Sequence, residues 1–186
     1  TVLSRGLGDV YKRQQTPSFT VYYFNAERSN EGEIAAAYDD FFEGVEFKSG
    51  GAYLERMDRG NVDGSHRLVR FGDTENWGLV ESKTREQWAK HMSDLDPLVE
   101  SRGPRYTGRI LGSNGVDPVT KPYIQIYDLE VSNPSKWLAA FAKLIEETKD
   151  SYNGGMVVYG TYDIGAPMGV NSCLLYTSPS PRDKTV

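Results

Sequence analysis

Two basic side chains of one predicted strand offer the clearest chemistry in the sequence. His66 begins the run HRLVRFG (66–72), and the two-residue alternation of a strand places it on the same face as Arg70. If that face points into a central cavity, the pair could bind an anionic or enolic ligand, with His66 carrying a proton near neutral pH. The alternative is a strand-end histidine near solvent and an arginine paired with a carboxylate, because charged side chains favour surfaces.

Aromatic and amide side chains form a second candidate group. Tyr22 and Phe24 share one face of a predicted strand, and an internal repeat places Gln125 and Tyr127 at the matching positions. Around a central cavity these side chains would line a pocket for a flat apolar ligand. Ordinary packing in the core explains the same residues, so both interpretations stay open.

Other polar groups fit common catalytic patterns poorly. His91 lies between Trp88 and Leu95 at helical spacing, which favours a hydrogen-bonded helix histidine over a ligand or base. The two histidines are the only ones in the chain, and their spacing forms no metal motif. We therefore expect neither a metal site nor a cofactor.

The two ends of the chain are related to each other as nucleic acid. One permitted codon choice for residues 1–14 has a reverse complement that encodes CLLYTSPSPRDKT, the run that begins at Cys173. The codons resemble the transposase recognition end and adapter arm used in sequencing-library preparation. We therefore interpret 1–14 and 173–186 as translated adapter, excluded from arguments about fold and chemistry. The native termini are then expected to be missing, and Cys173 is expected to have no role as a nucleophile.

Charge and hydropathy narrow the class of partner. The formal net charge is −5, and excluding five of the 21 basic and two of the 26 acidic residues at the ends makes it −8. Such an acidic chain argues against nucleic-acid binding, which needs clustered Lys and Arg. No apolar run approaches the roughly 20 residues of a membrane helix. We expect no membrane partner, a possible small-molecule ligand and a cytoplasmic location.

The order of predicted elements indicates an α+β fold. Strand and helix patterns alternate as β-α-β-β-α-β over 15–112, which is the ferredoxin-like unit. A polar linker at 113–122 precedes a second β-α-β pattern at 123–172. At an offset of 103 the second pattern repeats features of the first, such as Asn30 and Asn133 at the helix starts. The sequence thus predicts a tandem ferredoxin-like fold with a truncated second unit, and a fragment that can self-associate through its open sheet edge.

Residues 18–172 resemble the dimeric α/β-barrel superfamily, which includes antibiotic-biosynthesis-type monooxygenases and stress-responsive barrel proteins. The resemblance is carried by the element order, the duplication and SKTREQWAKHMSDLDPL (82–98), which is similar to the family's second helix. It implies two sheets that pack face to face around a pocket. The implied functions are a cofactor-independent oxygenase or isomerase for a small aromatic or enolic metabolite, a non-catalytic ligand-binding or stress-associated barrel, or a structural assembly protein.

Overall fold

The computed structural model describes residues 17–57, 64–73, 82–115, 123–152 and 155–178. The N-terminal adapter segment, most of the linker at 113–122 and residues 179–186 lie outside these ranges. Among the described helices, none combines the length and the apolar character needed to cross a bilayer.

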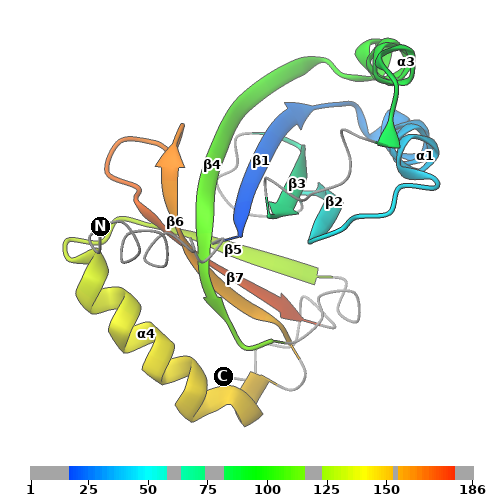
Figure 1. The fold of residues 1–186 in the computed structure, drawn as a ribbon. Helices are drawn as coiled ribbons and strands as arrows, with labels where there is room; N and C mark the ends of the chain where they lie inside the picture. Colours follow the sequence, from blue (N-terminus) through cyan, green and yellow to red (C-terminus); the bar gives the residue numbers. More distant parts are fainter. Residues whose placement is uncertain (1–16, 58–63, 74–81, 116–122, 153–154, 179–186) are drawn as a thin grey trace, which may run out of the picture.

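The described residues form a curled antiparallel sheet with helices packed against it (Figure 1). The strand order across the sheet is β2-β3-β1-β4-β6-β7-β5. The strands are β1 Ser18–Asn25, β2 Gly51–Arg56, β3 His66–Gly72, β4 Ser101–Ser113, β5 Tyr123–Leu129, β6 Val157–Ile164 and β7 Ser172–Ser178. The α-helices are α1 Glu31–Phe42, α3 Arg85–Leu95 and α4 Pro134–Thr148, with short 3-10 helices at Arg28–Asn30, Asp96–Leu98 and Lys149–Tyr152.

The first half of the sheet has the strand order β2-β3-β1-β4, as a ferredoxin-like unit requires. Helix α3 begins at the predicted capping box. The Thr84 hydroxyl accepts from the Gln87 backbone N–H at 3.2 Å, and the Gln87 side chain accepts from the Thr84 N–H at 2.8 Å. Helices α1 and α3 lie side by side against this half (Figure 1). Their shared core contains Phe24, Ile34 and Leu95, all buried.

The second half continues the same sheet. Strand β6 pairs with β4, and the order β6-β7-β5 parallels β2-β3-β1 of the first half. Helix α4 begins at Asn133, whose Oδ1 accepts from the Lys136 N–H at 3.1 Å, with Pro134 in its first turn as predicted. Its apolar face packs on Val157 and Tyr159 of β6. The predicted α+β fold is therefore present as a curled sheet with helices, whereas its origin by duplication stays a prediction.

Strand β7 comes from the segment that the sequence analysis assigned to adapter. It lies between β6 and β5 and pairs with both. Ser172 and Thr177 are fully buried, and the Thr177 hydroxyl accepts from the Met156 N–H at 2.8 Å. Residues that were encoded by an adapter can still pair as a strand, so the origin of this segment does not decide whether it is part of the sheet. The structure differs from the expectation that 173–178 takes no part in the fold.

Helix α1 differs from the prediction at its start. A 3-10 turn at Arg28–Asn30 precedes it, and Asn30, which the sequence places at the helix start, makes no side-chain capping bond. The Asn30 amide instead donates to the Leu98 carbonyl at 3.2 Å. Here a tertiary contact has replaced the local one.

Candidate functional site

An apolar cavity of about 350 Å³ lies on the face of the sheet opposite the helices. Both halves contribute to its wall, because inward-pointing side chains alternate with helix-facing ones along every strand. The wall includes Phe19, Val21, Tyr53, Glu55, Val69, Phe71, Ile126, Val158, Tyr162, Cys173 and Leu175. The volume falls in the range typical of small-molecule sites.

One rung of the sheet brings an ion pair to this wall. Glu55 of β2 stands opposite Arg67 of β3, which stands opposite Tyr23 of β1. The Arg67 Nε donates to Glu55 Oε2, and the two side chains are only 4% and 11% exposed, respectively. The other carboxylate oxygen, Glu55 Oε1, is buried and has no hydrogen-bond partner among the described residues.

Burial sets the electrostatics of this pair. It raises the pKa of the Glu55 carboxyl above its usual range, although Arg67 acts in the opposite direction. Burial also works against the charge of Arg67, but the interactions with Glu55 and Tyr23 together outweigh it and raise the guanidinium pKa. The site therefore holds a carboxylate of increased basicity at the edge of an apolar space.

A second polar contact lies on the wall from the other half. The Tyr162 hydroxyl donates to Asp128 Oδ1 at 2.6 Å. Burial raises the pKa of Tyr162 above its ordinary value, so this group stays protonated at neutral pH. Burial also raises the pKa of the Cys173 thiol to about 12, which agrees with the exclusion of Cys173 as a nucleophile.

The predicted pocket-lining residues lie on the opposite face from this cavity. Tyr22 and Phe24 point to the side covered by α1 and α3, where they line a different pocket. Gln125 and Tyr127 share a strand face, with the Tyr127 hydroxyl donating to Gln125 Oε1 at 2.9 Å and Tyr127 49% exposed. Alternation predicted which residues share a face, but it could not decide which face encloses the cavity. Tyr22 and Phe24 thus lie at the pocket beneath α1 and α3, and a ligand-binding role for the four residues stays a prediction.

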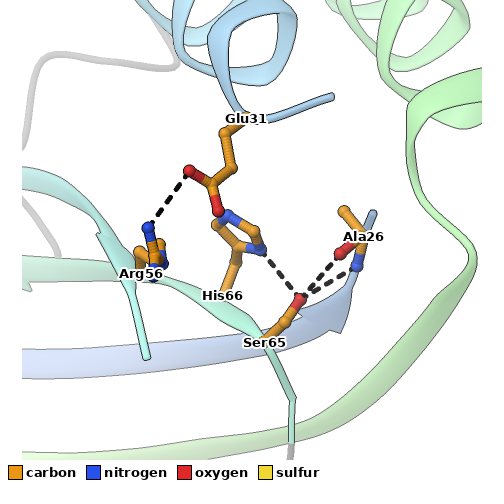
Figure 2. A network of polar contacts seen from close by, with 5 residues as sticks. All are labelled: Ala26, Glu31, Arg56, Ser65 and His66. Atoms are coloured by element: carbon orange, nitrogen blue, oxygen red, sulfur yellow. Dashed lines mark hydrogen bonds and ion pairs between the residues drawn. The ribbon is translucent and has the colours of Figure 1, made fainter. Parts of the chain in front are cut away.

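His66 forms part of a buried corner rather than the cavity wall (Figure 2). Its ring stacks on Phe24 at a centroid distance of 5.2 Å, and its Nδ1 lies 2.8 Å from the Ser65 hydroxyl. The Glu31 carboxylate lies beside the ring and accepts from Arg56 at 3.3 Å. Burial lowers the pKa of His66, an effect that Glu31 partly opposes.

Arg70 is held apart from His66. The two are four residues apart on β3, or about 13 Å along a strand, and Arg70 Nη1 donates to the Tyr22 hydroxyl at 3.3 Å. The structure therefore does not bring His66 and Arg70 together as one site, and a catalytic role for either stays a prediction. His91 is buried in helix α3 against Phe41, as expected for a structural helix histidine. Within the described ranges, no three His, Cys, Asp or Glu side chains gather as metal ligands would.

The sequence analysis missed Glu55 and Arg67. Both lie in predicted strands joined by a turn-rich link, and opposite charges across such a hairpin are the signal that could have found them. The signal is weak because the register of a hairpin with a long link is not fixed by its sequence.

Comparisons with known proteins agree on the architecture. No family model and no curated protein sequence matches the chain. Two solved structures named as putative monooxygenases are similar to it. The Fusobacterium nucleatum protein has a TM-score of 0.62 and 15% identity, over 90% of this chain and 78% of that one. The Lactobacillus acidophilus protein has a TM-score of 0.61 and 10% identity, over 89% and 78%.

A third structure, named as a putative chlorite dismutase, has a TM-score of 0.50 and 10% identity over 89% of this chain and 80% of that one. At these identities the likeness concerns the fold. The chain has the curled antiparallel sheet and helices of a dimeric α/β-barrel-like fold.

Proposed function

We propose that the apolar cavity binds a small, flat aromatic or enolic molecule and that Glu55 removes a proton from it, as a cofactor-independent oxygenase would. The observation that carries the proposal is a buried carboxylate with one oxygen free of hydrogen bonds on the wall of an otherwise apolar cavity. Similarity of fold to proteins named as monooxygenases supports this choice of reaction class by analogy alone.

The residues assign separate roles to the two partners of the ion pair. Glu55 is the general base, and its raised pKa makes it a stronger one once it is ionised. Arg67 is a positioning residue, because its bond to Oε2 fixes the carboxylate while Oε1 makes no hydrogen bond among the described residues. Phe19, Val69 and Phe71 exclude water and hold a ring by apolar contact.

The chemistry balances without an added reductant. Glu55 accepts a proton from a ring CH₂ group beside a carbonyl or enol, which leaves a delocalised carbanion. Molecular oxygen then forms a C–O bond with this carbon, and the peroxide takes back the proton from Glu55 to give a hydroperoxide, which loses water to leave a carbonyl. Overall, one CH₂ and one O₂ become one C=O and one H₂O. Return of the proton to a different carbon would instead give isomerisation.

The test compares the protein with Glu55→Gln, which keeps the side-chain shape but cannot act as a base. Bicyclic and tricyclic enolisable ketones are offered as substrates, and oxygen uptake is measured together with product mass. We expect Glu55→Gln to lower kcat by about 10²-fold or more, while probe binding stays within about threefold. The exposed Glu46→Gln serves as the matched control.

Each outcome has a defined meaning. For the unmodified protein, kcat should rise with pH as Glu55 ionises, because only the carboxylate can accept the proton. Equal kcat for Glu55→Gln and Glu46→Gln contradicts the role of Glu55. Tight probe binding with neither oxygen uptake nor a new product contradicts catalysis and favours a non-catalytic binding barrel. Failure to bind any of these probes contradicts the proposed ligand class.

A further inference from the structure

A second pocket of about 370 Å³ lies on the other face of β1 and β3, beneath helices α1 and α3. Residues from both helices, from β1 and β3 and from the start of β4 surround it. Its lining includes Tyr22, Phe41, Arg70, Trp88, His91 and Arg105. Their chemistry differs from that of the first cavity, which is almost wholly apolar.

One wall of this second pocket is aromatic. The buried Phe41 ring contacts the Trp88 ring edge-on at a centroid distance of 4.6 Å and stacks on the His91 ring at 4.1 Å. The Nδ1 atom of His91 is buried and has no hydrogen-bond partner among the described residues. This wall is therefore built from aromatic rings, and it contains one buried ring nitrogen without a hydrogen-bond partner among the described residues.

The opposite wall is cationic. The guanidinium carbons of Arg70 and Arg105 lie 5.9 and 5.7 Å from the centre of the Tyr22 ring. Arg102 also lines the pocket, but its charge is paired with Asp96. No Asp or Glu is present among the described lining residues, although the chain as a whole is acidic. Positive charge is thus concentrated here beside aromatic surface.

We propose that this second pocket binds a flat aromatic carboxylate, with its ring against Phe41 and Trp88 and its carboxylate on Arg70 and Arg105. Guanidinium groups recognise carboxylates through paired hydrogen bonds, and an aromatic wall favours a flat ring. The first cavity is unsuited to the same molecule because its wall carries the Glu55 carboxylate. The inference concerns a different site and does not rest on the function proposed for the first cavity.

The experiment uses 2-naphthoate as the probe and its neutral analogue 2-naphthamide, with the full chain and isothermal titration calorimetry. We expect 2-naphthoate to bind at least about tenfold more tightly than the amide, since a charge-assisted contact is worth about 1.5–3 kcal/mol. Arg105→Gln should weaken naphthoate binding about tenfold. Arg105 is exposed, so this variant should fold normally, which circular dichroism can verify.

Two control variants complete the design. Arg109→Gln removes a guanidinium from the same strand outside the pocket, where Arg109 pairs with Asp163, and should leave naphthoate binding within about twofold of the unmodified protein. Glu55→Gln should also leave it unchanged. The inference is overturned if the amide binds as tightly as the carboxylate, or if Arg105→Gln and Arg109→Gln bind equally well. It is also overturned if Glu55→Gln strengthens naphthoate binding, because the anion would then occupy the first cavity.

Discussion

The two halves of the sheet share a strand order but differ at one rung beside the first cavity, where the first half contributes Glu55 to the wall and the second half contributes only apolar side chains. At the offset of 103 that relates β1 to β5, the strand registers align two rungs. The first-half rung is Glu55–Arg67–Tyr23, and the second-half rung is Val158–Leu175–Ile126. The same place in the fold is therefore ionic in one half and apolar in the other.

This difference argues that the ion pair is not needed to build the sheet. Taking two charges out of water costs several kcal/mol per ion, and apolar residues of similar volume often stabilise a core as well or better. In the second half, the matching rung consists of apolar residues only. We therefore infer that the ion pair of the first half serves the function of the cavity and not the folding of the sheet.

The halves also differ in how their first strands are paired, and removing a pairing strand should cause the largest loss of stability. Strand β1 is paired on both sides, whereas β5 is the last strand of the described sheet and pairs only with β7. Removing residues 173–186 would take away β7 and leave β5 without a partner. From the structure we expect the free energy of unfolding to fall by more than about 5 kcal/mol, which is comparable to the whole stability of a small domain, so the second half should unfold. Urea unfolding followed by circular dichroism measures this loss.

The adapter interpretation makes the contrary prediction for the same variant. If 173–186 is dispensable, the truncated chain should keep its denaturation midpoint. A truncated chain in which α4, β5 and β6 are protected from hydrogen exchange as before would support that interpretation. In that case the pairing of β7 would not reflect a stable strand.

The next largest effect should come from breaking the ion pair in two ways. Arg67→Leu alone leaves the Glu55 carboxylate buried without its partner, so we expect a loss of about 3–5 kcal/mol in the free energy of unfolding. Glu55→Val and Arg67→Leu together, with Tyr23→Phe to remove the neighbouring hydroxyl, copy the apolar character of the other half. This triple variant should be as stable as the original chain within about 1 kcal/mol, or more stable. A triple variant less stable than Arg67→Leu would show that the pair is structural.

The sequence predicted elements well and orientations poorly, and the reason is physical. Periodicity and end signals such as Asn133 before α4 act within one element, so the sequence alone indicates where such a helix begins. Strand β1 carries aromatic or β-branched side chains on both faces, so alternation alone does not decide whether Val21 or Tyr22 faces the first cavity. The choice depends on how the sheet curls, which is a property of the whole sheet. Strand β7 was missed because its residues had been excluded on other grounds.

The buried histidines should make the free energy of unfolding depend on pH, by a smaller amount than the changes above. Burial lowers the pKa values of His66 and His91, partly opposed by Glu31 and Asp94 respectively. The unfolded chain therefore binds protons at a higher pH than the folded chain does. Stability should be constant above the unfolded histidine pKa of about 6.5 and should fall as the pH is lowered through it.

Urea unfolding at a series of pH values measures this effect. His91→Gln should flatten the slope between about pH 7 and 5, because one of the two contributing groups is gone. A slope unchanged in both His91→Gln and His66→Gln would mean that carboxylates cause the acid sensitivity. Glu55 acts in the opposite direction because its pKa is raised, so Glu55→Gln should make the slope steeper.

The smallest expected change in stability comes from substituting Asn30 and Asn133, which occupy equivalent positions in the two halves. Asn133 caps α4 through its Oδ1, whereas Asn30 precedes α1 and uses its amide N–H to reach the Leu98 carbonyl. Asp keeps the acceptor but loses the donor, so the same substitution should have different effects. Asn133→Asp should change the unfolding free energy by no more than a few tenths of a kcal/mol, because Asp and Asn are similar N-caps. Asn30→Asp should cost about 1 kcal/mol, because it removes a hydrogen bond and places a carboxylate beside a carbonyl oxygen. Equal costs for the two variants would mean that the repeated asparagines have the same role, and that the contact between Asn30 and Leu98 does not stabilise the first half.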